Sequence, residues 1–230
     1  MKKIGKILGQ YIIYIFIICV AFILNSVNGL LGWDPLLLKI FHKSNIYGNQ
    51  LGLILIIVSI ILMLLYWLAY HLELKHKNNW NFKQEVEFNW RSIIIAIGGF
   101  IIIAISQFIV MHLLNKPSAN QSEIGNIVNN AGQIFELNLI IIAPIAEELI
   151  FRGMFFNTFF TRPTTFNLWV GSVVNGFLFG YIHAGLSIQI ISYWIMGIIF
   201  SFIYLYTKDI KYSMLTHIFN NALAAILMIV

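Results

Sequence analysis

Residues 163–207 read PTTFNLWVGSVVNGFLFGYIHAGLSIQIISYWIMGIIFSFIYLYT and contain no Asp, Glu, Lys or Arg. A helix needs about 20 apolar residues to cross the hydrocarbon core of a bilayer. This stretch is therefore long enough for two crossings, and Gly185 is a plausible position for the break between them. The stretch predicts two consecutive transmembrane helices.

The composition of the whole chain also points to a membrane protein. Of the 230 residues, 60% are hydrophobic and only 10% are charged, whereas an ordinary soluble domain has about 45–50% and about 25%. A soluble fold of this size could not hide so much apolar surface from water. The single cysteine, Cys19, rules out an intrachain disulfide. These figures exclude a soluble globular domain, a disordered chain and a disulfide scaffold.

Five further runs complete the predicted fold. They are Ile7–Trp33, Ser44–Tyr70, Ser92–Asn115, Leu137–Phe160, which contains charges, and Tyr212–Val230. We predict an all-α fold, a polytopic transmembrane helix bundle of about seven spans that forms one domain over residues 1–230. The first span, about residues 8–26, is expected to be retained, although Lys2, Lys3 and Lys6 also resemble the start of a cleavable signal peptide.

The distribution of Lys and Arg predicts how the chain crosses the membrane. Inner segments carry an excess of cations, so the net charge of +5 reports topology and not nucleic-acid binding. With a cytoplasmic N-terminus, three cations lie outside, namely Lys39, Lys43 and Lys116, and ten lie inside, namely Lys2, Lys3, Lys6, Lys75, Lys77, Lys83, Arg91, Arg162, Lys208 and Lys211. The loop His71–Arg91, with Trp80, Phe82, Phe88 and Trp90, is expected at the inner interface, and residues 116–130 are expected to form an external loop.

The fourth run carries charges where lipid is expected. Glu147, Glu148 and Arg152 lie near its middle, and ionisable groups inside a membrane mark a functional site by default. Glu148 and Arg152, spaced i and i+4, share one helix face and are expected to form a structural ion pair. Glu147 is turned away by about 100° and has no cation one turn away, which suits a general base. Pro144 is expected to open the helix nearby.

Two later spans each carry a histidine among apolar residues. Gly176 and Gly180 form a GxxxG face, which we expect to pack on the fourth span and so bring His183 near the carboxylates. His217 and Asn221 share one face of the last span. Each could instead be a residue that only packs or hydrogen-bonds helices together. The predicted boundaries place His183 near the outer end of its span and His217 near the inner end of its own, so the helices must be tilted or broken for both to meet Glu147.

Three ordered motifs resemble a known family. Glu147-Glu148-x-x-x-Arg152, then Phe179-x-x-x-His183, then His217-x-x-x-Asn221 are similar to the motifs of the CPBP family, the CAAX-protease and bacteriocin-processing (Abi) intramembrane endopeptidases. Each motif alone is weak, whereas the ordered trio on separate apolar spans is fairly specific. The resemblance covers about residues 139–225, which form the core that carries the motifs.

The resemblance implies a membrane-embedded peptidase acting on a peptide or membrane-protein substrate. It implies that Glu147, helped by His183, activates water, that His217 and Asn221 hold the oxyanion, and that Glu148 and Arg152 orient the first motif. A zinc enzyme is the alternative, with Glu147, His183 and His217 as metal ligands and an open fourth position. We favour the mechanism without a metal or other cofactor.

Other functions remain open from the sequence. A small proton- or metal-coupled transporter would need polar groups along a path through the other spans, and the first three spans contain almost none. A non-catalytic immunity or scaffold membrane protein is a further alternative. The short chain, rich in Ile, Asn and Lys, suggests a bacterial cell membrane. There the resemblance points to peptide maturation or bacteriocin self-immunity.

Overall fold

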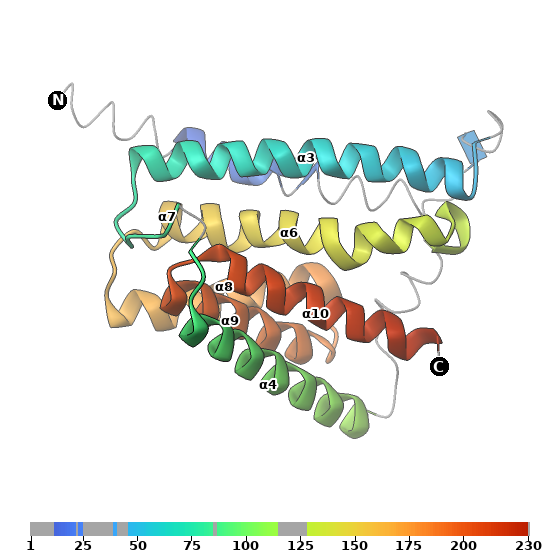
Figure 1. Ribbon diagram of the computed structural model, residues 1–230. Helices are drawn as coiled ribbons and strands as arrows, with labels where there is room; N and C mark the ends of the chain where they lie inside the picture. The colour runs from blue at the N-terminus through green and yellow to red at the C-terminus, as the bar shows by residue number, and fades with distance from the viewer. Residues whose placement is uncertain are drawn as a thin grey trace.

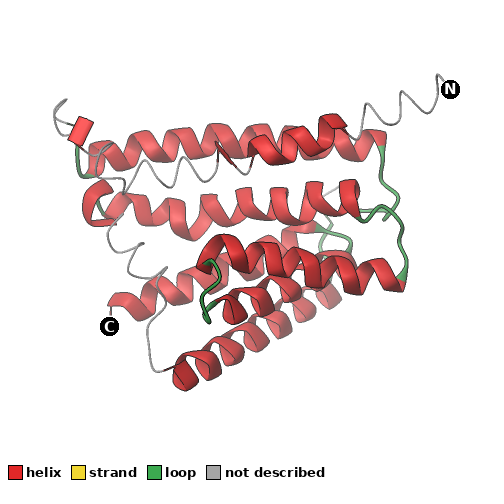
Figure 2. Cartoon of the chain, turned by 180° about the vertical axis from the view of Figure 1, so that it is seen from behind, coloured by secondary structure: helices red, strands yellow, loops and turns green. Residues whose placement is uncertain are grey.

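The computed structural model describes residues 12–21, 23–24, 39–40, 46–84, 87–114 and 128–229, and every regular element among them is a helix (Figures 1 and 2). The all-α prediction is therefore confirmed. The elements are α3 (Asn49–His76), α4 (Trp90–Leu114), η1 (Gln133–Phe135), η2 (Asn138–Ile142), α6 (Ala143–Glu148), η3 (Leu149–Met154), α7 (Phe155–Phe159), α8 (Thr165–Ala184), α9 (Ile190–Thr207) and α10 (Ile210–Ile229).

Three of the described helices are long and apolar enough to cross a membrane by length and composition alone. They are α3, the segment Trp90–Leu113 of α4, and α9, and a shorter apolar helix covers Ile12–Ala21. The other predicted spans also correspond to helices, but these are interrupted or richer in polar residues. The chain is thus a helical membrane bundle, as its composition predicts.

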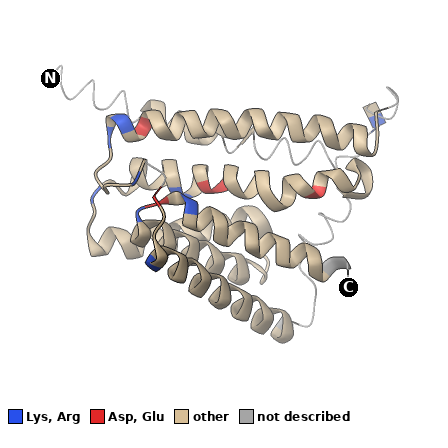
Figure 3. Ribbon diagram, in the orientation of Figure 1, with Lys and Arg blue, Asp and Glu red and all other residues tan. Residues whose placement is uncertain are grey.

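Several predictions fall on residues that the structure does not describe. They include the two ends of the first span, which is predicted at about residues 8–26, and the predicted external loop up to residue 127. The cations Lys2, Lys3, Lys6, Lys43 and Lys116 also lie outside the described residues. The side of the membrane on which the N-terminus lies therefore stays a prediction. Most of the described Lys and Arg residues gather at one end of the bundle (Figure 3), as a common inner side requires.

The charged fourth span is one continuous helical run over residues 136–159, which we call the motif helix. It lies between α3 on one side and α8, α9 and α10 on the other (Figures 1 and 2). Helix α4 packs on α9 and α10. The motif helix is therefore surrounded by protein, which is the environment that its charges need.

The glycine face of α8 packs on α9, so the predicted contact with the fourth span is wrong. A Cβ on Gly176 would lie 2.7 Å from the Trp194 carbonyl oxygen, and one on Gly197 would lie 2.7 Å from the Gly176 Cα. The two helices form a hairpin, so the glycines allow close packing between two helices that are consecutive in the chain. The predicted break at Gly185 is confirmed, since α8 ends at Ala184 and Gly185 has φ 57°, a conformation that glycine adopts without strain.

The loop between α3 and α4 enters the bundle instead of lying wholly at the interface. Trp80 and Phe82 are each 3% exposed, so their predicted interfacial position is wrong. The Trp80 Nε1 donates a hydrogen bond to the Phe160 carbonyl at 2.7 Å, and a satisfied indole N–H allows the ring to be buried. Phe88 and Trp90 are 71% and 69% exposed, as an interfacial position requires.

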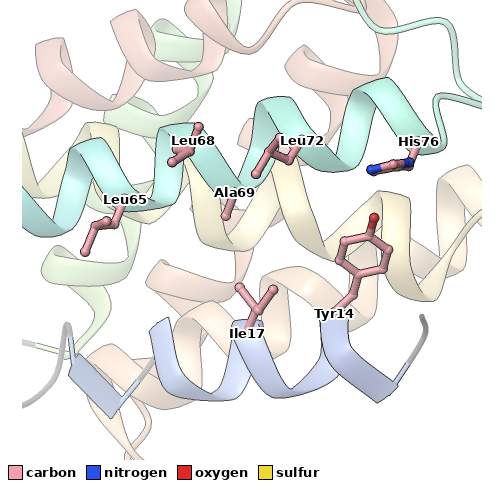
Figure 4. A pocket seen from close by; sticks show the side chains of 7 residues that line it. All are labelled: Tyr14, Ile17, Leu65, Leu68, Ala69, Leu72 and His76. Carbon is pink, nitrogen blue, oxygen red and sulfur yellow. The ribbon is translucent and has the colours of Figure 1, made fainter. Parts of the chain in front are cut away.

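A shallow groove of about 310 Å³ separates the helix Ile12–Ala21 from α3 (Figure 4). Its walls are apolar, with Tyr14 and His76 at one end, and the remaining lining residues are Ile17, Leu65, Leu68, Ala69 and Leu72. None of the predicted site residues lines this groove.

Candidate active site

The motif helix changes its hydrogen-bonding pattern on both sides of the two glutamates. Wide, π-helical turns form η2 and η3, and the short α-helix α6 lies between them and ends at Glu148. Pro144 occupies the start of α6, where its missing N–H cannot extend an α-helical ladder. Such π-helical turns are rare in proteins as a whole, but those that do occur are often found at functional sites. The helical run is thus widened just before Pro144 but stays continuous, so it does not open at this residue.

Glu148 and Arg152 form an ion pair in the interior, as their spacing predicts. The Arg152 Nη1 lies 3.0 Å from the Glu148 Oε1, and both side chains are 0% exposed. The guanidinium lies 4.8 Å from the ring centroid of Phe179 and 5.0 Å from that of Phe200, distances at which an aromatic face attracts a cation. The pair is thus enclosed by rings and has no contact with solvent.

Glu147 faces both histidines. Its Oε2 lies 3.5 Å from the His183 Nε2 and 3.8 Å from the His217 Nε2. The structure therefore resolves the conflict in depth between the two predicted spans. The side chains of Glu147 and His183 are 15% and 17% exposed, whereas that of His217 is 2% exposed. The site opens to the surface at Glu147 and His183 and closes at His217.

The Nδ1 atom of each imidazole ring makes a hydrogen bond. The His183 Nδ1 donates to the Phe179 carbonyl at 2.8 Å, and the His217 Nδ1 donates to the Glu148 Oε1 at 3.0 Å. Because these acceptors carry no proton, each neutral ring has its lone pair on Nε2. Three acceptor groups, two imidazoles and one carboxylate, then face one another, and a proton held among them relieves their repulsion. The cluster can store and move a proton.

Aromatic rings hold the two imidazoles in place. His183 stacks on Phe179 with centroids 4.2 Å apart and on Tyr193 at 5.2 Å. His217 stacks on Phe200 at 4.5 Å. Tyr193 and Phe200 could not be predicted as neighbours of these rings, because an aromatic residue in an apolar span carries no signal of a contact with a residue on another helix.

Asn221 lies one helical turn after His217 and binds the motif helix. Its Nδ2 donates to the Leu139 carbonyl, inside η2, at 2.9 Å. An amide nitrogen carries two N–H donors, so this bond leaves one. The structure thus brings Glu147, Glu148, Arg152, His183 and His217 into one cluster and places Asn221 at its edge.

Glu147, His183 and His217 are also the three residues that the alternative zinc mechanism would use as ligands. Within the described parts of the chain, no group of three or more His, Cys, Asp or Glu side chains is arranged to hold a metal ion. We therefore derive no step through a metal ion.

Known proteins match the part of the chain that carries this cluster. A family profile described as type II CAAX prenyl endopeptidase Rce1-like matches residues 130–223. YdiL of Bacillus subtilis (strain 168), named as a candidate membrane peptidase, is 29% identical over 142 residues, which cover 59% of this chain and 56% of YdiL. UPF0177 protein YaiF of Lactococcus lactis subsp. lactis (strain IL1403) is 29% identical over 154 residues, which cover 62% of this chain and 66% of YaiF.

A longer match is the membrane-embedded CAAX protease MroQ of Staphylococcus aureus (strain USA300), 29% identical over 195 residues, which cover 80% of this chain and 74% of MroQ. The chain spans just over half the length of YdiL and about two thirds of that of YaiF. No solved structure matches the chain. The profile match includes all three motifs, and with the membrane peptidase relatives it shows that this part of the chain is similar to the CPBP family of CAAX protease-like membrane proteins.

Proposed function

We propose that the chain is an intramembrane endopeptidase that hydrolyses a peptide bond in a membrane-associated peptide or protein. The observation that supports this most strongly is the Glu147 carboxylate facing the Nε2 atoms of His183 and His217 at 3.5 Å and 3.8 Å. A carboxylate beside two imidazoles, partly open to the surface, combines a general base with a store of protons. The names of the profile and of MroQ support the same activity.

In the proposed reaction, Glu147 takes a proton from a water molecule while the water oxygen attacks the carbonyl carbon of the scissile peptide bond. The carbonyl becomes a tetrahedral oxyanion, which accepts hydrogen bonds from His217, whose Nε2 carries the proton held in the cluster in this proposal, and from the remaining N–H of Asn221. Glu147 and His183 then deliver the proton to the leaving nitrogen as the C–N bond breaks. One water is consumed, and the products are a carboxylic acid and an amine.

In this proposal the buried pair of Glu148 and Arg152 holds the reacting groups in position. Glu148 accepts from the His217 Nδ1 and pairs with Arg152, which fixes the ring so that its Nε2 points at Glu147. In this proposal Glu148 and Arg152 do not touch the substrate, and they orient the groups that do.

The proposed substrate is a peptide or protein of a bacterial cell membrane. All the reported relatives are bacterial, and one of them is named a CAAX protease. We propose a role in peptide maturation or in self-immunity to a bacteriocin. Under this proposal the activity uses no metal, and a chelator decides between this mechanism and zinc hydrolysis.

The test is cleavage of quenched fluorescent peptides by the purified full chain in lipid nanodiscs. We expect the wild type to cleave at least one peptide and Glu147→Gln to cleave none. Glu136→Gln is the matched control, because Glu136 belongs to the same helical run but not to the cluster, and it should retain the wild-type rate. Full turnover by Glu147→Gln would remove the catalytic assignment.

A further inference from the structure

A buried asparagine on α8 contacts the motif helix, as the partly buried Asn221 does from α10. Asn175, on α8, is 0% exposed, and its Nδ2 donates to the Phe151 carbonyl. Phe151 lies inside η3, so each of the two π-helical segments has a carbonyl that accepts from an asparagine on another helix. Side chains that insert into a helical ladder in this way stabilise local departures from α-helical geometry.

The orientation of the Asn175 amide is fixed by a serine. The Ser201 hydroxyl donates to the Asn175 Oδ1 at 3.0 Å, so the amide nitrogen must point to the Phe151 carbonyl. The same hydroxyl lies 2.8 Å from the Gly197 carbonyl, and its single proton is shared between the two acceptors. Ser201 is 0% exposed, so no solvent competes for these bonds.

The Gly197 carbonyl connects this serine to the charged pair. Arg152 donates to it through Nη2 at 3.1 Å, and Arg152 Nη1 pairs with Glu148 at 3.0 Å. Gly197 is closely packed against α8, because a Cβ there would lie 2.7 Å from the Gly176 Cα. The carbonyl is therefore a fixed acceptor for a buried guanidinium.

Together these contacts form an unbroken buried chain that starts at Asn175 and runs through Ser201, the Gly197 carbonyl, Arg152 and Glu148 to His217. A buried charge with few partners takes its orientation from each of them. We propose that Asn175 and Ser201 are positioning residues that act through Arg152 and Glu148 to aim His217 at Glu147. This inference rests on the proposed peptidase function.

The test uses two variants and a matched control in the full chain. Asn175→Asp keeps the shape of the side chain but removes the N–H donor to Phe151, and Ser201→Ala removes the hydroxyl that links Asn175 to Gly197. The control is Ser172→Ala, because Ser172 is also on α8 and 0% exposed and its hydroxyl makes no hydrogen bond within the described residues.

The first readout does not need activity. In protein labelled with ¹⁵N-histidine, the His217 signals are identified by their loss in His217→Asn. We expect the Nδ1 signal of His217 to shift in Asn175→Asp and in Ser201→Ala and to stay in place in Ser172→Ala. If Asn175→Asp loses its helical circular dichroism, Ser201→Ala decides alone.

The second readout is cleavage of the quenched fluorescent peptide that the wild type cuts. We expect kcat to fall about tenfold in both variants, the effect of one buried hydrogen bond, with KM unchanged. A His217 signal that matches that of Ser172→Ala would overturn the proposal, as would an unchanged kcat. If the wild type cuts no peptide, the proposed function fails, and the His217 signal still decides whether the chain of contacts reaches that ring.

Discussion

The two adjacent glutamates of the motif helix occupy opposite environments. Glu148 is sealed, with its side chain 0% exposed and paired to Arg152 and His217. Glu147 has 15% of its side chain exposed and faces two imidazoles. A rotation of about 100° per residue is enough to separate a structural carboxylate from one that can meet water. This difference supports the proposal that Glu148 contributes to stability and that Glu147 takes part in the chemistry.

The largest expected effect separates these two roles directly. Glu147→Gln should lower turnover by about 10²–10⁴-fold, the usual contribution of a general base, and leave the free energy of unfolding close to that of the wild type. Initial cleavage rates and thermal unfolding in the same nanodiscs measure both quantities.

Glu148→Gln should instead lower the free energy of unfolding by about 3–5 kcal/mol, because it leaves Arg152 as a buried charge without its partner. The double variant Glu148→Gln, Arg152→Met removes the stranded charge and should recover much of this loss. Equal effects of Glu147→Gln and Glu148→Gln on both stability and turnover would refute the division between the two sides.

A smaller effect on stability is expected at Gly197, where α9 packs closely on α8. Gly197→Ala would place a methyl carbon 2.7 Å from the Gly176 Cα and 3.0 Å from the Phe179 Cβ. We expect a loss of about 1–3 kcal/mol in the free energy of unfolding, as for other overpacked cores. Gly98→Ala on α4 is the control, because a Cβ there meets nothing within 4 Å. A cost at Gly98 equal to that at Gly197 would contradict the packing argument.

The loop that closes one end of the bundle should contribute less. Trp80→Phe removes the hydrogen bond to the Phe160 carbonyl and should cost about 0.5–1.5 kcal/mol of unfolding free energy without changing kcat. Trp90→Phe, at a position 69% exposed, should change neither quantity. A fall in kcat for Trp80→Phe with unchanged stability would show that this loop belongs to the chemistry.

The smallest expected effect is that of a chelator. Under the proposed mechanism without a metal, we expect 1,10-phenanthroline to leave the cleavage rate unchanged. Loss of activity that added Zn²⁺ restores would assign Glu147, His183 and His217 as ligands and replace the mechanism proposed above.

Structural features that depend only on the spacing of residues along the chain could be predicted from the sequence. The pairing of Glu148 with Arg152 follows from i and i+4 positions, and the break at Gly185 follows from the length of one apolar run. The partner of the Gly176 face and the burial of Trp80 depend on which helices become neighbours, and apolar spans carry little information on that choice. The contact of Asn221 with Leu139 depends on a π-helical turn, which a uniform period of 3.6 residues does not reveal.

Loop 77–89 fastens several helices to one another at a single end. Trp80 binds the carbonyl that follows α7, and the Lys83 N–H donates to the Lys208 carbonyl just after α9 at 2.7 Å. Under the proposed function, a substrate that parts these helices should therefore leave this end together, and the amide hydrogens of α9 next to residue 208 should exchange slowly.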